Sequence, residues 1–349
     1  MTNRSSMTRR GAIRAGLAAT ATLSAGRAFA EWAPSARYPD PAVEILQPEF
    51  SAYRVFNSSV ERLATGFDWL EGPVWIGDGR YLLVSDIPND RLIRWDEITG
   101  ETAIFRQPAG WSNGNARDLE GRLITCEGGM RRVTRTEFDG SITVLADAFE
   151  GKKLNSPNDL DVAADGSVWF TDPPFQISNF YEGEKAEQEQ DHQGVYRIAP
   201  DGALSLVIDD LQGPNGIAFS PDRATVYIVE GRAQPNRLVW AYDVGADGTV
   251  SNKRQHIEAQ NYGALDGIAC DVDGNLWCGW GSTGAPEGDS EALDGVMVFN
   301  TAGQAIGHIH LPERCANLCF GGRHGNRLFM ASSHSIYAVY VNTQGAGFA

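Results

Sequence analysis

The chain has 349 residues, of which 42% are hydrophobic and 21% are charged, an ordinary composition for a globular protein. Its formal net charge of −16 at pH 7 excludes nucleic acid and anionic membrane surfaces as electrostatic partners, whereas a small neutral ligand or a cation is compatible with it. The length allows two average domains or one large β domain.

Residues 1–30 have the features of an export signal. A twin arginine ending at Arg10 precedes a run of small apolar residues, and "AFA" ending at Ala30 is a small-x-small cleavage site. The apolar run is about a dozen residues, too short for the ~30 Å hydrocarbon core of a bilayer. The twin arginine favours the export route for folded proteins. We therefore expect cleavage after Ala30, no membrane association afterwards, and a periplasmic location for a mature chain of net charge −21, since five arginines and no acids are removed.

The rest of the chain repeats one unit six times. Each copy starts at a polar residue and continues as an apolar strand, a Gly/Asp turn, a strand with aromatic residues and a further strand pair. Four short strands in ~40–50 residues are the period of a propeller blade. The sequence therefore predicts an all-β fold, a six-bladed β-propeller with a central metal site, as a single domain over residues 31–349. The copies begin at Glu71, Asn115, Asn158, Asn215, Asp266 and Asn317.

Two segments do not belong to the repeats. Residues 41–67 precede the first copy, and we expect them to supply an outer strand to the last blade, which would close the ring and hide a sheet edge. Residues 175–193, rich in Glu and Gln, form an insertion in the third copy. Such a loop either lies over the face that carries the site or is a solvated surface loop.

The six starting residues are all Glu, Asp or Asn. The innermost strand of a propeller blade runs along the central channel, so these side chains are predicted to converge at one mouth of it. Unpaired, they would be costly to bury, and the carboxylates of Glu71 and Asp266 would repel each other. A divalent cation resolves both problems, and oxygen ligands suit calcium or magnesium, with manganese next and zinc less natural. The alternative is that these residues only start strands through local turns.

Four motifs, "EGPVW", "SPND", "PNGIAFSPD" and "DGIACDVDGNLW", resemble those of the family of senescence marker protein, gluconolactonase and luciferin-regenerating enzyme, and bacterial gluconolactonases most of all. The resemblance implies a six-bladed propeller with one catalytic divalent metal, most simply calcium. It also implies Asp266 as the catalytic acid/base. The metal ligands that it implies are Glu71, Asn158, Asn215 and Asp266.

The sequence departs from the family at two places. Ser156 stands where animal members carry an arginine that holds substrate, and "CEGG" stands where bacterial relatives often read Cys-Glu-His-Gly. Both places are near the expected substrate, so the natural lactone stays open.

These features predict metal-dependent hydrolysis of a small sugar lactone such as glucono-1,5-lactone. The metal would polarise the ring carbonyl, and Asp266 would take the proton of the attacking water, with Asp172 as the alternative base. The rival functions are a different hydrolase on the same propeller, acting on organophosphates or aryl esters, and a non-catalytic propeller that binds calcium or a sugar. The further candidates for substrate binding are Lys153, Asn155, Asn113, Asn115, Glu127, Arg131 and Asp172.

The histidine pair "HIH", His308 and His310, would place both rings on one face of a strand, a geometry that can bind metal. It falls in an outer strand of the fifth blade, away from the axis, and we interpret it as structural or solvated. The five cysteines are an odd number, and we expect buried apolar thiols, with one disulfide as the alternative.

Overall fold

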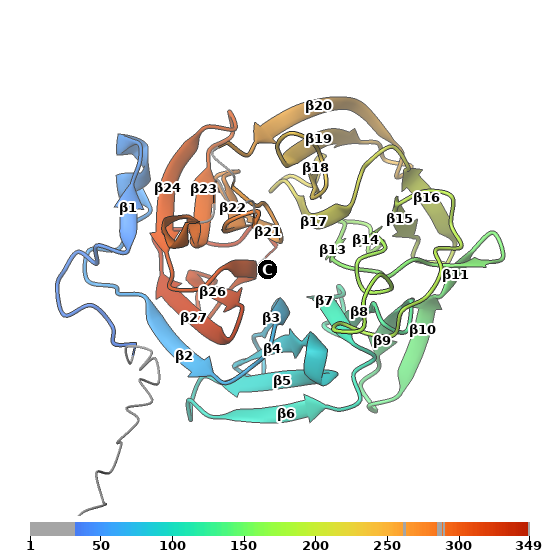
Figure 1. The fold of residues 1–349 in the computed structure, drawn as a ribbon, viewed down its shortest axis with the longest axis horizontal. Coiled ribbons are helices and arrows are strands. Elements are labelled where there is room, and N and C mark those ends of the chain that lie inside the picture. Colours follow the sequence, from blue (N-terminus) through green and yellow to red (C-terminus); the bar gives the residue numbers. More distant parts are fainter. Residues whose placement is uncertain (1–31, 261–262, 285–287, 289, 348–349) are drawn as a thin grey trace, which may run out of the picture. The chain divides into compact units, whose positions relative to one another are not determined.

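The computed structural model describes residues 32–260, 263–284, 288 and 290–347. The predicted export signal, residues 1–30, lies outside the described residues. Pro34–Ala349 form one compact unit, in which six antiparallel sheets are arranged around a common centre as the blades of a propeller (Figure 1). The predicted fold class is confirmed.

Blades one to three each contain four strands in meander order, with the innermost strand first. A two-stranded ribbon, β11 with β12, lies between blades two and three in the sequence. The strands are β3 (Leu70–Ile76), β4 (Tyr81–Asp86), β5 (Arg91–Asp96) and β6 (Thr102–Arg106) in blade one; β7 (Ser112–Arg117), β8 (Leu123–Glu127), β9 (Arg132–Thr136) and β10 (Ile142–Ala146) in blade two; β11 (Ala148–Phe149) and β12 (Lys152–Lys153) in the ribbon; and β13 (Leu160–Val162), β14 (Val168–Asp172), β15 (Gly194–Ile198) and β16 (Leu204–Ile208) in blade three.

Blades four to six follow the same order, and strands from the N-terminal segment join blades five and six. The strands are β17 (Pro214–Phe219), β18 (Thr225–Glu230), β19 (Leu238–Val244) and β20 (Val250–Glu258) in blade four; β21 (Ile268–Cys270), β22 (Leu276–Trp280), β23 (Gly295–Phe299), β24 (Ala305–His310) and β1 (Val43–Ile45) in blade five; and β25 (Cys315–Gly321), β26 (Arg327–Ser332), β27 (Ser335–Tyr340) and β2 (Glu61–Thr65) in blade six. The helical elements of the described residues are three short 3₁₀ helices: η1 (Pro48–Ala52), η2 (Ile87–Asn89) and η3 (Glu291–Leu293).

Burial follows position within each blade. The second strands β8, β14 and β22 are buried at every residue, whereas the outer strands β6 and β10 are mostly exposed. The second strands are covered on both faces by neighbouring blades, so apolar and aromatic residues predominate in them without alternation, and the acids that end β8 and β14, Glu127 and Asp172, are buried with them.

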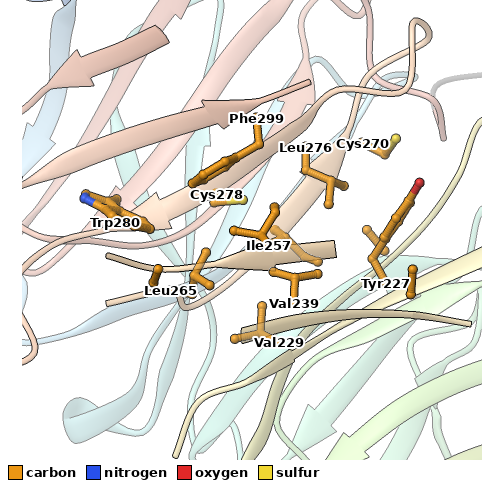
Figure 2. Packing of buried hydrophobic residues seen from close by; sticks show 14 residues of the cluster. Tyr227, Val229, Val239, Ile257, Leu265, Cys270, Leu276, Cys278, Trp280 and Phe299 are labelled. Carbon is orange, nitrogen blue, oxygen red and sulfur yellow. The ribbon is translucent and has the colours of Figure 1, made fainter. Parts of the chain in front are cut away.

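Neighbouring blades share their hydrophobic cores. Between blades four and five, Val229 and Val239 pack in one cluster with Leu276, Cys278 and Trp280 (Figure 2). Burying side chains of this size contributes roughly 1.5–3 kcal/mol each. Each blade is therefore stabilised by its neighbours, and this stabilisation holds the central site between them.

The N-terminal segment closes the ring. Strand β2 pairs antiparallel with β27, with Glu61 opposite Ala338, which confirms the predicted outer strand of the last blade. Strand β1 in addition pairs with β24 of blade five, a contact that the sequence did not indicate. Phe50 of η1 is buried, with its ring centroid 5.9 Å from that of Trp277 in blade five.

All five cysteines are free, and four of them are buried, as expected for apolar thiols. In the described part of the chain, no helix is both long enough and apolar enough to span a bilayer.

Candidate active site

The innermost strands of the propeller bring polar side chains together at one cavity. Its volume is about 300 Å³, at the lower end of the range for small-molecule pockets. Five blades each contribute one residue from the start of the innermost strand or just before it, and blade six contributes Arg314, just before β25. The five residues are Glu71, Asn113, Asn158, Asn215 and Asp266.

Close contact between neighbouring backbones positions these residues. Gly72 follows Glu71 with a φ of +52°, and a Cβ at this position would lie 2.0 Å from the carbonyl oxygen of Asn113. At Gly114, whose N–H donates to the Asn158 carbonyl at 2.7 Å, a Cβ would lie 2.6 Å from that carbonyl oxygen. Only glycine, which has no Cβ, allows such a close approach. The glycine after the polar residue therefore lets adjacent blades meet near the axis, and the preceding side chains gather there.

The structure corrects the expected convergence in blades two and six. Asn113, and not Asn115, lies in the cavity: Asn113 precedes Gly114 as Glu71 precedes Gly72, and a β-bulge follows at this point in both β7 and β3. Bulges commonly re-aim side chains next to active sites. Asn115 and Asn317 instead line a second cavity of about 790 Å³. The six starting residues therefore do not all line one cavity, although the Asn317 side chain still hydrogen-bonds Glu71.

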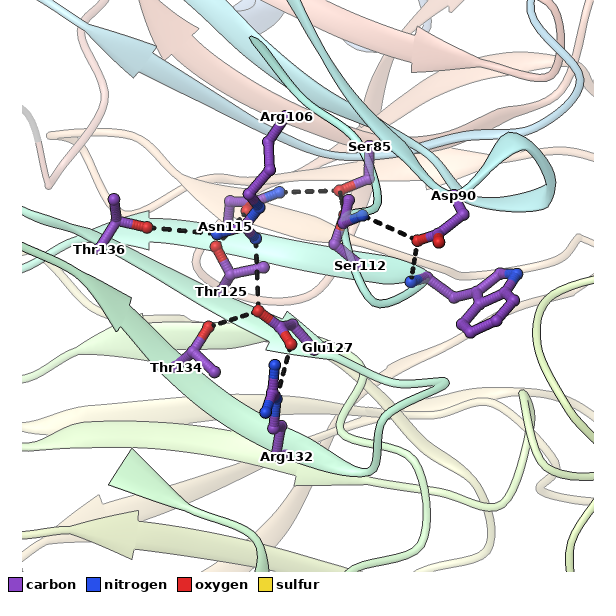
Figure 3. Close-up of polar contacts among 12 residues, drawn as sticks. Ser85, Asp90, Arg106, Ser112, Asn115, Thr125, Glu127, Arg132, Thr134 and Thr136 are labelled. Atoms are coloured by element: carbon purple, nitrogen blue, oxygen red, sulfur yellow. Dashed lines mark hydrogen bonds and ion pairs between the residues drawn. The ribbon is translucent and has the colours of Figure 1, made fainter. Parts of the chain in front are cut away.

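Asn115 is held by structural hydrogen bonds. Its Nδ2 donates to the Gly72 carbonyl at 2.9 Å and to Ser85 Oγ at 3.0 Å, and its Oδ1 accepts from Thr125 Oγ1 at 2.9 Å (Figure 3). These bonds join blades one and two. They occupy both the Nδ2 and the Oδ1 of the Asn115 amide.

The two carboxylates expected to bind metal have different environments. Asp266 accepts hydrogen bonds at both oxygens, from Asn215 Nδ2 at 2.6 Å and from Arg314 Nη2 at 2.7 Å. Glu71 accepts only a longer bond from the Gly72 N–H at 3.2 Å and a bond from the Asn317 side chain. Burial, and then the charges of Asp266 and Asp159, raise the pKa of Glu71 well above its usual range. A positive charge in the cavity would therefore stabilise the ionised form of Glu71.

The donor set fits a hard divalent cation. The carboxylate and amide groups that line the cavity offer oxygen ligands, and neither histidine nor cysteine is among the lining residues. Asn113 Oδ1 is buried and has no hydrogen-bond partner. A buried acceptor without a partner is costly, and a bound cation or its water would satisfy it.

The insertion, residues 175–193, lies against this cavity. Phe175, Ser178, Asn179 and Glu182 all belong to its lining. Burial, and then the charge of Asp266, raise the pKa of Glu182. The first of the two interpretations of the insertion is therefore confirmed. Glu182 was missed as a site residue because four other acids lie nearby in the insertion and nothing in the sequence distinguishes it from them.

Three predicted substrate-binding residues hold this insertion in place. Asn155 Nδ2 donates to the His192 carbonyl at 3.0 Å, and Arg131 Nη1 contacts Glu189 Oε1 at 3.1 Å. The backbone N–H of Lys153 donates to the same Glu189 carboxylate at 3.0 Å. None of the three belongs to the lining of the 300 Å³ cavity, and their contact with substrate stays a prediction.

Asp172 and Glu127 also lie outside the lining of this cavity. Asp172 is fully buried beneath Asn155, whose backbone N–H donates to it at 2.7 Å, and burial raises the pKa of Asp172 to about 7. Glu127 contacts Arg132 at 2.7 Å, Thr134 at 2.9 Å and Arg106 at 3.5 Å in the polar network of blade two (Figure 3). The structure thus places Asp172 and Glu127 in supporting positions around the cavity.

Fold and site together define a six-bladed β-propeller whose polar cavity, beside the inner strand ends, is suited to a cation and a small ligand. Residues 69–334 match the model of the SMP-30/Gluconolactonase/LRE-like region. The chain belongs to this family, as the sequence motifs indicated.

Individual relatives agree with this assignment. A gluconolactonase of Zymomonas mobilis is 30% identical over 324 residues, which cover 86% of each chain. The solved structure of a gluconolactonase from Xanthomonas campestris is 34% identical, with a TM-score of 0.77 over 86% of this chain and 94% of that one. The structure of a calcium-binding regucalcin from Agrobacterium tumefaciens shares the fold at 19% identity, with a TM-score of 0.64 over 82% of this chain and 94% of that one.

Proposed function

We propose that this protein is a lactonase that hydrolyses a sugar lactone such as glucono-1,5-lactone in the 300 Å³ cavity, with the help of a divalent cation. The observation that carries the proposal is the convergence of Glu71, Asn158, Asn215 and Asp266 on one buried cavity. The gluconolactonases of Zymomonas and Xanthomonas, both similar over most of the chain, support lactone hydrolysis as the reaction.

The four converging residues would hold the cation, and calcium is the ion that we propose. When bound, it supplies a Lewis acid that polarises the lactone carbonyl. The calcium-binding regucalcin with the same fold supports this choice, as does the all-oxygen donor set.

Asp266 is the proposed general base. Asn215 and Arg314 bond one carboxylate oxygen each, which fixes the orientation of the group while each oxygen keeps a lone pair. Asp266 takes a proton from water as the water oxygen bonds to the carbonyl carbon. The ring C–O bond then breaks, and the proton passes to the leaving ring oxygen. The product is the open hydroxy acid, whose new carboxyl group then releases its proton to solvent at neutral pH.

Other lining residues suit the substrate and the product. Trp69 and Phe175 offer flat apolar surfaces to a sugar ring. Arg237 donates to the Leu265 carbonyl at 2.8 Å and lines the same cavity. Its positive charge compensates the negative charge that develops as the neutral lactone becomes an acid. Glu182 from the insertion adds a hydrogen-bond acceptor for a sugar hydroxyl.

A titration assay at constant pH with glucono-1,5-lactone tests the proposal, after correction for spontaneous hydrolysis. We expect turnover by the calcium-loaded protein, loss of turnover after complete removal of metal, and recovery when calcium is returned. Unchanged activity in metal-free protein would contradict the metal-dependent mechanism, and absence of turnover for every lactone in a panel would contradict the lactonase itself.

Two variants separate the roles of the carboxylates. Glu71→Gln removes a ligand charge, so its activity should recover as calcium is raised. Asp266→Asn removes the base as well, so kcat should fall by about 10²–10⁴-fold and stay low at saturating calcium. Equal rescue of both variants by calcium would assign Asp266 to metal binding alone.

A further inference from the structure

A second group of metal-binding side chains lies at the edge of blade five, away from the cavity. Glu44 on β1 pairs directly with His308 on β24, and His310 follows two residues later on the same face. One ligand atom from each of the three side chains lies within 4.8 Å of the other two. The cluster therefore joins the N-terminal strand to the outer strand of a blade.

The geometry of the cluster is close to that of a metal site. His310 Nε2 lies 2.7 Å from Glu44 Oε2, and the two imidazole rings have centroids 3.9 Å apart. Bonds of about 2.0–2.2 Å from zinc to nitrogen and oxygen place neighbouring ligand atoms of a tetrahedral site about 3.3–3.5 Å apart. The 2.7 Å contact is shorter than these separations and the other ligand atoms lie within 4.8 Å, so the side chains would shift as an ion binds.

The buried histidine has a free nitrogen. His308 is 4% exposed, and its Nε2 is buried without a hydrogen-bond partner. Backbone carbonyls of Leu293 and Asp294 interact with the same ring, so they leave Nε2 as the unused nitrogen. When one ring N–H of a neutral imidazole donates to a carbonyl, the other nitrogen keeps a free lone pair. This is the tautomer typical of metal ligands.

We propose that Glu44, His308 and His310 bind one zinc ion, which pins β1 to β24. Two imidazoles and one carboxylate are a zinc ligand set, unlike the all-oxygen set of the cavity. Glu44 and His310 are partly exposed, with side-chain exposures of 49% and 35%, so the ion has a path from solvent and a fourth position open to water. The site is a structural clamp on the N-terminal segment, separate from lactone hydrolysis.

Zinc stoichiometry tests the proposal. Untagged, calcium-saturated protein is dialysed against micromolar zinc, and bound zinc is measured by elemental analysis. We expect one zinc per chain in the wild type and none in His308→Gln or His310→Gln. The wild-type thermal midpoint should rise by about 3–5 °C at zinc a hundredfold above its Kd, and this rise should be absent in both variants.

Control variants test whether the zinc ion binds at this cluster. His310→Gln changes a half-exposed side chain, so it remains informative if His308→Gln folds poorly. His324→Gln, an exposed histidine outside the cluster, should bind zinc like the wild type, as should Glu71→Gln. Lactone turnover should be unchanged in His310→Gln. Wild type without bound zinc, or zinc that is lost in Glu71→Gln but kept in His310→Gln, would overturn the proposal.

Discussion

Among single residues, the contrast between the two central carboxylates is the reason that we propose a cation in the cavity. Asp266 already has an arginine and an amide as partners at 2.7 and 2.6 Å. Glu71 lacks a cationic partner of this kind among the described residues, and burial disfavours its charge. Removing one partner of a buried charge is expensive because the remaining charge is uncompensated. The binding energy of the metal should therefore depend strongly on Glu71, whereas Asp266 is held in place before the metal arrives.

Asp172 makes the stability of the protein depend on pH. Its pKa is raised by burial from an ordinary 3.8 to about 7. Between these values the unfolded chain has released the proton while the folded protein keeps it, so stability is full below about pH 4 and falls as pH rises to about 7.

Asp172→Asn should remove this dependence. From about pH 5 to pH 7, the wild type should lose about 2 kcal/mol of unfolding free energy relative to the variant. Urea unfolding at several pH values measures the difference. A constant difference across this range would mean that Asp172 is ionised in the folded protein.

Among the structural elements, the insertion, residues 175–193, forms a cover beside the cavity and is held in place by specific hydrogen bonds. Gln176 Nε2 donates to the Trp111 carbonyl at 2.9 Å and to the Glu182 carbonyl at 2.8 Å. The side chain of Gln176 is buried, and it therefore fixes the backbone of Glu182 beside the cavity.

Gln176→Ala should loosen this cover. Loss of two buried hydrogen bonds, at about 1 kcal/mol each, should raise KM by about tenfold and change kcat less, because Asp266 is untouched. Tryptic cleavage after the exposed Lys185 should be faster. Gln188→Ala is the matched control, since Gln188 bonds only to Gln190 and His192 among the described residues. An unchanged KM in Gln176→Ala would mean that the cover does not position substrate.

The N-terminal segment is the second element with a measurable role. Phe50 is 1% exposed and packs against blade five, whereas Phe56 in the same segment is 67% exposed. Phe50→Ala should lower the free energy of unfolding by about 3 kcal/mol, and Phe56→Ala by less than about 0.5 kcal/mol. Calorimetry or urea unfolding measures both. Equal effects would show that the segment contributes little to closing the ring.

In the whole molecule, the ring brings side chains from separate blades to one cavity. Blades one, two, four and five each contribute the residue before a glycine, blade three contributes Asn158 and blade six contributes Arg314. The acidic balance of the chain, −16 overall, favours cation entry and disfavours anionic polymers.

We propose that residues 1–30 direct export of the whole protein. When the full chain is expressed in a Gram-negative host, the protein recovered from the periplasmic fraction should have Glu31 as its first residue. Changing the twin arginine at positions 9 and 10 to lysine should keep it in the cytoplasm. Fractionation and intact mass measure both, and a periplasmic product from the lysine variant would point to the other export route.

The sequence by itself determined the propeller, its blade number, the closing strand β2 and the family, because repeats, turn residues and strand patterns are local properties of the chain. It also predicted six converging residues, of which Glu71, Asn158, Asn215 and Asp266, the ligand set that the family resemblance implies, line the cavity. The structure showed that Asn113 and not Asn115 joins them; Asn113 precedes Gly114 as Glu71 precedes Gly72, a sequence signal that the alignment of the repeats did not use. Only the tertiary structure decided the place of Glu182 and the contact between Glu44, His308 and His310. These depend on how segments far apart in the chain pack, and no local pattern contains that information.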